Sequence, residues 1–181
     1  MILIIGISGA GKSFQGRTLS QKLNCSWVSL GSLLRQSIDS GDLRSEMLAG
    51  HLLDDSLVIP LLDKELKKLD AKNKECVLDG SPRTIAQAQW LVEQFGAKKI
   101  KFTAAIHLKV SEPEARRRLI ERGRPDDNPQ AIDERFEEYQ EVIIKIIDFL
   151  KRNEFTVYEV SGEAPPPVVA DKILAILGGA R

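Results

Sequence analysis

The chain has 181 residues, which is enough for one well-buried α/β core with small inserted lobes, so a single domain is expected. Its 26 basic and 26 acidic side chains cancel, and this balance argues against binding to nucleic acid or to an anionic membrane through a global field. No apolar run approaches the roughly 18 residues of a membrane span, and no charged segment precedes the first apolar run. Cys25 and Cys76 have largely apolar neighbours, which predicts buried thiols in a reducing cytoplasm.

The chain begins with the apolar run Ile2–Ile5, followed directly by Gly6–Ser13, which reads G-x-x-x-x-G-K-S. Glycines allow successive backbone N–H groups to turn inward around an oxyanion, and the following helix adds its positive N-terminal end. Lys12 can then reach the β- and γ-phosphates, and the Ser13 hydroxyl can meet the accompanying Mg²⁺. A turn that only starts a helix would need fewer glycines and no lysine at this offset. The segment therefore predicts a site for a nucleoside triphosphate.

Short strand-like runs alternate with longer helical patterns along the rest of the chain. The predicted strands are 2–5, 26–29, 76–78, 104–110 and 156–160; the predicted helices are 12–23, 32–40, 42–49, 54–69, 85–95, 112–122, 129–150 and 168–177. Asn128 and Pro129 open the long helix as N-cap and first helical residue, and 165–167 read as a stiff turn. One predicted apolar stripe of the long helix consists of Ile132, Phe136, Tyr139, Ile143, Ile146 and Leu150. Such alternation predicts a parallel sheet with helices on both faces and ligands at the carboxyl ends of the strands.

The segment Asp79–Thr84 follows the third predicted strand and brings a carboxylate, a glycine and an arginine to its carboxyl end. Asp79 can hold Mg²⁺, directly or through water, because a hard cation prefers oxygen ligands. Arg83 offers a planar fork that suits phosphate. The alternative is that Asp79 caps a turn and pairs with Arg83 on the surface. Beside a phosphate loop, a role in phosphate transfer is the stronger interpretation.

A second group of arginines surrounds the linker before the long helix. Arg118 and Arg122 are four residues apart and face the same way on a helix. The run 116–118 is ordinarily a solvated face or a nucleic-acid patch, but the balanced charge and the lack of interleaved aromatic residues weaken the second interpretation. We expect Arg116 or Arg117 to lie on the surface, and we expect functional roles for Arg118, Arg122, Arg124 and Arg135.

Taken together, these motifs resemble the adenylate kinase family of nucleoside monophosphate (NMP) kinases, from Met1 to about Leu177. The family order is a glycine-rich loop, T-G-D-x-x-R, G-x-L-V, D-G-[FY]-P-R with a glutamine four residues on, R-x-x-x-R, G-R-x-D-D and a further arginine. In this chain the corresponding segments are 6–13, 30–35, 50–53, 79–83 with Gln87, 118–122, 123–127 and Arg135.

The resemblance implies a P-loop NTPase α/β fold: three α/β/α layers around a five-stranded parallel sheet, with an NMP-binding insert at about 29–53 and a minimal lid at about 122–128. It implies Mg²⁺ held by Ser13 and Asp79, no zinc, ATP and an acceptor monophosphate as partners, no nucleic acid or membrane, and a monomer. The implied catalytic residues are Lys12, Arg83, Arg122, Arg124 and Arg135. ATP is assigned to Gly9, Ala10, Gly11, Lys12, Ser13, Phe14, Arg118, Arg122, Gly162 and Ala164. The monophosphate is assigned to Leu30, Gly31, Arg35, His51, Leu52, Leu53, Gly80, Arg83, Gln87, Arg124 and Arg135.

The implied reaction needs no general base, because the acceptor is already an oxyanion. Catalysis then consists of aligning two anions and stabilising the charge as it redistributes, and a single arginine contributes about 10³–10⁵ in rate in related phosphoryl transfers. Water must be excluded from the γ-phosphate, and closure of a lid serves this purpose.

Three features depart from the family pattern. Phe14 removes a hydroxyl that would approach the α-phosphate of the donor. Leu30 and Ser32 replace the threonine and aspartate of the acceptor site, which leaves AMP, UMP and CMP open as acceptors. Only Gly123 separates Arg122 from Arg124, so the lid is very short and lacks the zinc tetracysteine. The leading expectation is transfer from ATP to AMP. The alternatives are a UMP/CMP kinase, or a nucleotide-dependent switch or assembly factor with slow ATPase activity.

Overall fold

A single parallel sheet forms the middle of the protein. The computed structural model describes residues 1–37, 42–49 and 51–179. Its strands are β1 (Ile2–Gly6), β2 (Ser26–Ser29), β3 (Cys76–Asp79), β4 (Ala104–Lys109) and β5 (Val157–Ser161). They form a five-stranded sheet in the order β2-β3-β1-β4-β5, and every strand pair is parallel. The expected α/β fold with five parallel strands is therefore confirmed.

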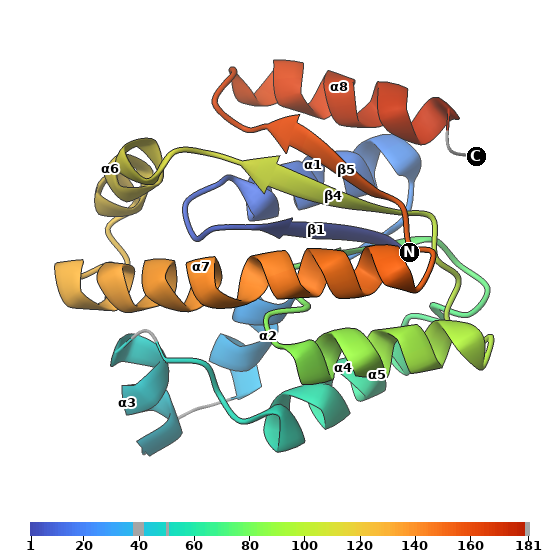
Figure 1. Ribbon diagram of the computed structural model, residues 1–181, viewed down its shortest axis with the longest axis horizontal. Helices are drawn as coiled ribbons and strands as arrows, with labels where there is room; N and C mark the ends of the chain where they lie inside the picture. Colours follow the sequence, from blue (N-terminus) through green and yellow to red (C-terminus); the bar gives the residue numbers. More distant parts are fainter. Residues whose placement is uncertain (38–41, 50, 180–181) are drawn as a thin grey trace.

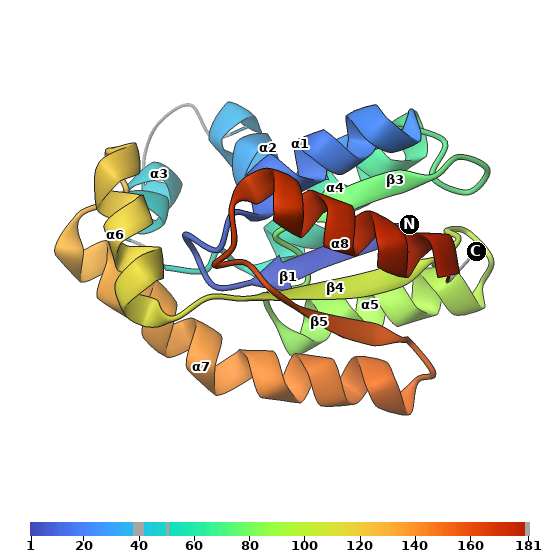
Figure 2. The same ribbon diagram turned by 90° about the horizontal axis from the view of Figure 1, so that it is seen from above.

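Helices cover both faces of this sheet (Figures 1 and 2). On one face lie α1 (Lys12–Leu23) and α8 (Pro166–Gly179), and on the other lie α4 (Asp55–Lys68), α5 (Ile85–Gly96) and α7 (Pro129–Arg152). The helices α2 (Leu30–Ser37), α3 (Asp42–Ala49) and α6 (Glu112–Arg122) lie toward the end to which the strand arrows point. In the described part of the chain, no helix is long and apolar enough to cross a membrane.

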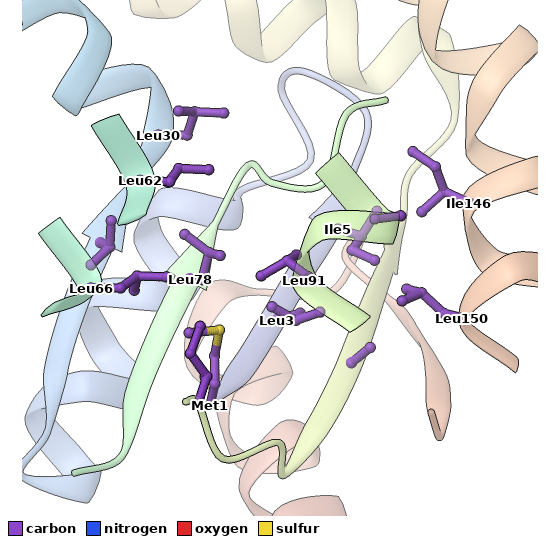
Figure 3. Packing of buried hydrophobic residues seen from close by; sticks show 14 of the residues in the cluster. Met1, Leu3, Ile5, Leu30, Leu62, Leu66, Leu78, Leu91, Ile146 and Leu150 are labelled. Carbon is purple, nitrogen blue, oxygen red and sulfur yellow. The ribbon is translucent and has the colours of Figure 1, made fainter. Parts of the chain in front are cut away.

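Apolar side chains from alternate positions of β1 divide the core into two layers. Leu3 and Ile5 pack in the layer beneath α4, α5 and α7, as Figure 3 shows with Leu62, Leu91 and Ile146. Ile2 and Ile4 pack in the other layer, with side chains of α1, α6 and α8. Successive side chains of a strand point to opposite faces, so a continuously apolar strand is the signature of a sheet buried on both sides.

The long helix α7 has the cap and the apolar stripe that its sequence predicts. The Asn128 side chain accepts a hydrogen bond from the Ala131 N–H, and Pro129 is the first helical residue. Three residues of the stripe, Ile132, Ile146 and Leu150, are at most 1% exposed. The stripe thus packs α7 against the core, and the helix extends to the carboxyl ends of the strands, where the loops converge.

Two predicted helix starts were wrong. Helix α2 begins at Leu30, directly after β2, and not at 32, so Leu30 and Gly31 belong to its first turn. Helix α8 begins at Pro166, inside the segment interpreted as a stiff turn, and the Val168 and Val169 N–H groups donate to the Pro165 carbonyl. Prolines are tolerated there because the first helical turn has no internal partner for its N–H groups.

The cysteines partly follow expectation. Both are thiols, but only Cys76 is buried, and Cys25 is partly exposed. Burial raises the pKa of the Cys76 thiol to about 11.

Two isoleucines of α7 offer a matched test of the core. Ile146 is 1% exposed and Ile144 is 65% exposed. We expect Ile146→Ala to lower the free energy of unfolding by about 2–5 kcal/mol through lost transfer energy and a residual cavity. Ile144→Ala should change it by less than about 0.5 kcal/mol. Urea denaturation followed by circular dichroism measures both values, and similar values for the two variants would contradict the packing described.

Candidate active site

The loop between β1 and α1 has the backbone that an anion site requires. Gly9 has φ 84°, and a Cβ there would lie 2.5 Å from the Ala115 carbonyl oxygen. Gly11 has φ 91° and caps α1, so Lys12 and Ser13 are the first residues of the helix. A side chain at Gly9 would force the loop away from α6, and the positive φ values favour glycine at both positions. The loop and the positive N-terminal end of α1 together form a phosphate cradle.

Lys12 lies folded onto this loop. Its Nζ donates to the carbonyl oxygens of Gly6 at 2.7 Å and Ile7 at 2.8 Å. Burial lowers the pKa of Lys12 to about 7, while the charge of Asp79 acts in the opposite direction. The ammonium group is therefore easily deprotonated until an anion arrives beside it.

Ser13, in the first turn of α1, meets Asp79, the last residue of β3. The Ser13 hydroxyl donates to Asp79 Oδ2 at 2.7 Å, and Asp79 is 2% exposed. This contact contradicts the alternative in which Asp79 pairs with Arg83 on the surface. A hydroxyl and a carboxylate beside a phosphate cradle fit Mg²⁺, which binds oxygen and keeps several positions for water and substrate phosphates. No group of three or more His, Cys, Asp or Glu side chains within 1–37, 42–49 and 51–179 is placed to hold a metal ion.

A cleft of about 630 Å³ opens at the carboxyl ends of the strands. It brings together most of the residues singled out in the sequence: Gly9, Gly11, Lys12, Ser13, Phe14, Leu30, Gly31, Arg35, His51, Leu52, Leu53, Asp79, Gly80, Arg83, Gln87, Arg118, Arg122, Arg124 and Arg135. Of the predicted site residues, Ala10, Gly162 and Ala164 lie outside its lining. Gly50, the first residue of the G-x-L-V segment, lies outside the described residues.

Two buried carboxylates hold the arginines of this cleft. Asp127 accepts two hydrogen bonds from Arg122, at 2.8 and 2.6 Å, and lies 3.4 Å from Arg135. Asp126 accepts from Arg135 at 2.7 Å. Burial raises the pKa of Asp127, but its bonds to Arg122 and the Arg124 N–H outweigh this effect, and the net pKa is lowered. Asp127 therefore stays ionised, and both carboxylates orient the guanidinium groups that they pair with.

The side of the cleft formed by α6 includes Arg118. This guanidinium donates to Glu114 at 2.7 Å and to the Gly162 carbonyl at 3.0 Å, which ties α6 to the segment after β5. Arg117 pairs with Glu114 and Glu121 on the exposed side of α6, and Arg116 pairs with Asp133 of α7. Phe14 is 53% exposed and lines the cleft.

Another side of the cleft contains Arg35, Arg83 and a set of apolar side chains. Arg83 Nε donates to the Gly80 carbonyl at 3.0 Å, and Arg35 lies 3.4 Å from the Ser32 hydroxyl. The apolar lining consists of Leu30, Leu34, Leu52, Leu53 and Val58. The Leu52 N–H donates to Glu138 of α7 at 3.3 Å, which holds this side of the cleft against the long helix.

Sequence reasoning missed several supporting residues. It quoted Asp126 and Asp127 within a motif without seeing that they orient arginines, although adjacent carboxylates beside arginines were a usable signal. Asp55, which accepts from Gln87 and Thr84, was missed because its partners are about 30 residues away. Tyr139 was assigned only to the apolar stripe, yet its hydroxyl lies 2.6 Å from His107 Nε2.

Comparison with known proteins gives consistent matches. The family model described as adenylate kinase matches residues 4–155. The chain is 36% identical over 153 residues to an adenylate kinase of Corynebacterium urealyticum, covering 82% of this chain and 84% of that protein. It is 31% identical to adenylate kinase 2 of a Nostoc species over 97% of each chain. It is 32% identical to an adenylate kinase of Prochlorococcus marinus over 98% of each chain.

The lowered pKa of Lys12 predicts proton uptake when a triphosphate binds. With a pKa of about 7, the amine is mostly neutral at pH 8, and added phosphate charge raises the pKa again. We expect uptake of about one proton per bound triphosphate at pH 8 and almost none at pH 6, with affinity falling as pH rises. Calorimetry in buffers of different ionisation enthalpy measures this uptake. Lys12→Arg, which stays protonated, should show none; absence of uptake by the unmodified protein at pH 8 would refute the assignment.

Proposed function

The chain belongs to the adenylate kinase family and is a nucleoside monophosphate kinase, and from this premise we propose that it catalyses reversible, Mg²⁺-dependent transfer of the γ-phosphoryl group of ATP to AMP, giving two ADP. The observation that carries the proposal is the pairing of two cationic sites in one cleft. The loop with Lys12 forms one, and Arg35 and Arg83 form the other. An enzyme that only hydrolyses ATP has no use for the second.

The proposed donor half holds the triphosphate on the loop, the start of α1 and Lys12. For ATP to bind, the Lys12 ammonium must exchange its two carbonyl partners for phosphate oxygens. Ser13 and Asp79 would hold Mg²⁺, which supplies charge neutralisation to the β- and γ-phosphates. Arg118, the segment 162–164 and the loop residues Gly9–Phe14 would contact the rest of ATP.

The proposed acceptor half holds the monophosphate on Arg35 and Arg83, with the base among the leucines of the cleft. One phosphate oxygen of AMP forms the new bond to the γ-phosphorus as the bond to the β–γ bridging oxygen breaks, and that electron pair leaves with ADP. No proton needs to be removed from the nucleophile. Arg122, Arg124 and Arg135 surround the transferring group and stabilise the charge spread over its oxygens.

The proposed assignment of regions follows from these roles. Residues of about 29–53 form the acceptor lobe, and the connection of about 122–128 forms a minimal lid on a single kinase domain. The expected species is a monomer in the cytoplasm. AMP is favoured over UMP and CMP because the similar proteins are adenylate kinases. Gln87 lies beside the apolar part of the cleft and offers a hydrogen bond to the base.

Coupled assays with ATP and each of AMP, UMP, CMP and GMP, read against ATP alone, test the reaction. We expect the largest kcat/KM with AMP, and a rate at least about 100-fold below it with ATP alone, because an oriented acceptor outcompetes water. Preference for UMP or CMP would replace AMP in the proposal. A rate that no monophosphate changes would exclude the kinase activity in favour of an ATP-hydrolysing switch.

Arg83→Ala separates the acceptor half from the donor half. Loss of the guanidinium should lower kcat/KM for AMP by about 10²–10³, because charge on the phosphate is no longer stabilised. The dissociation constant of ATP should change by less than about threefold. Arg116→Ala, which removes a surface arginine paired with Asp133, is the matched control and should leave both values near those of the unmodified enzyme.

An equal loss of ATP affinity in Arg83→Ala would place this side chain on the donor instead.

A further inference from the structure

The Gln87 side chain lines the cleft beside its apolar residues, but it is only 2% exposed and most of its hydrogen-bonding capacity is already used. Its Oε1 accepts from the Arg83 N–H at 2.9 Å and from the Ser81 hydroxyl at 3.1 Å. Its Nε2 donates to Asp55 Oδ1 at 2.8 Å. An amide has two lone pairs on oxygen and two N–H donors, so one N–H remains.

The orientation of this amide is dictated by its neighbours. The Arg83 N–H can only donate, so it requires the oxygen of Gln87. Asp55 is a carboxylate that can only accept when ionised, so it requires the nitrogen. Rotating the amide by half a turn would place donor against donor and acceptor against acceptor. The arrangement therefore has one stable orientation.

Asp55 anchors this arrangement from another helix. It is the first residue of α4, while Gln87 and its neighbour Thr84 belong to the start of α5. Asp55 Oδ2 accepts from the Thr84 hydroxyl at 2.7 Å, so each carboxylate oxygen has a separate donor. Ser81 is fully buried and stands where the family pattern has Phe or Tyr. Its hydroxyl is what occupies the second lone pair of Gln87.

We propose that Asp55, together with Ser81, is a positioning residue that makes Gln87 a donor-only contact for the acceptor base. The base must then present an acceptor, a ring nitrogen or a carbonyl oxygen, to the remaining Nε2 hydrogen. Gln87 does not read an exocyclic amino group, since no lone pair of its oxygen is left. This inference rests on the proposed function, because it assumes that a nucleotide base occupies the apolar part of the cleft.

Exchanging the donor and the acceptor between residues 55 and 87 tests the inference and keeps a hydrogen bond between α4 and α5. We call this double variant the swap variant. In Asp55→Asn/Gln87→Glu, the Asn amide donates to the Glu carboxylate, which keeps its contacts to Arg83 and Ser81 but presents only acceptors to the base. We expect KM for AMP to rise at least about tenfold, with KM for ATP changed less than about twofold. Asp55→Asn alone lets residue 55 either donate to Gln87 or accept from it, so the KM for AMP should lie between those of the unmodified enzyme and the swap variant.

Two further variants separate positioning from stability. Asp55→Ala frees the Gln87 amide and should also raise KM for AMP several-fold. Asp63→Ala, which removes a partly exposed carboxylate of the same helix paired with Lys67, should not. Thermal melting identifies any loss of folding. A lower melting temperature in Asp55→Ala with unchanged KM for AMP would show a purely structural role and overturn the proposal.

Substrate analogues identify the atom that Gln87 reads. With the unmodified enzyme, one of 1-deaza-AMP and 7-deaza-AMP should have a kcat/KM about tenfold below that of AMP. With the swap variant, the same analogue should have nearly the same kcat/KM as AMP, because the contact is already absent there. Purine riboside monophosphate, which lacks the amino group, should lose equally with the unmodified enzyme and with Gln87→Ala, which has no side-chain oxygen. A penalty for the missing amino group that disappears in Gln87→Ala would show that the Gln87 oxygen contacts the base, and would overturn the donor-only assignment.

The same measurements distinguish this inference from the proposed function. An unmodified enzyme that does not phosphorylate AMP contradicts the proposed function. An unmodified enzyme that phosphorylates AMP, with a swap variant of equal KM, contradicts only the role of Asp55 and Gln87.

Discussion

The arrangement of the cleft depends on a balance between crowded cations and buried carboxylates. Lys12, Arg83, Arg122 and Arg135 lie close enough that the arginine charges help to lower the pKa of the lysine, after burial itself. Asp79, Asp126 and Asp127 are each at most 8% exposed and offset part of this repulsion. Like charges gathered without such partners would destabilise the fold, and a buried charge requires compensation. The carboxylates neutralise the positive charge of the cleft only in part, and the anions expected to bind would neutralise the rest.

The parallel sheet explains how these groups meet. Strands β1 and β3 are neighbours, and Ile4 is in register with Asp79, so the loop after β1 and the carboxylate at the end of β3 emerge side by side. Helix α7 spans the core and carries Arg135 near its start and Ile146 further along. The same helix is thus packed in the core and exposed to the cleft. Side chains proposed to bind anions are in this way attached to a sheet and a helix that are packed in the core.

Much of this organisation follows from the sequence, because hydrophobic period and glycine placement are local signals. The bounds of α1 and β2 are those that the sequence predicts, and the phosphate loop lies where a strand ends and a helix begins. The start of α8 was missed, because a proline run indicates a turn and a first helical turn equally well. The pairing of Asp126 with Arg135, or of Asp55 with Gln87, depends on tertiary geometry. Motif spacing indicates which residue types are present, but it does not specify which donor meets which acceptor.

The turn between α6 and α7 has a mechanical consequence. Helix α6 ends at Arg122, and Gly123 follows it with φ 61°. Helix α7 begins at Pro129, six residues after Gly123, and Arg124 lies in the connection. Arg118, Arg122 and Arg124 therefore belong to one short continuous segment. Asp127 connects its end further, because it accepts hydrogen bonds from the Arg122 side chain and from the Arg124 N–H. In the proposed reaction these arginines serve different nucleotides, so a displacement of α6 that favours one nucleotide also moves the arginine of the other. Such shared displacement is a route to a coupling free energy between the two binding events, which by thermodynamic linkage acts equally in both directions.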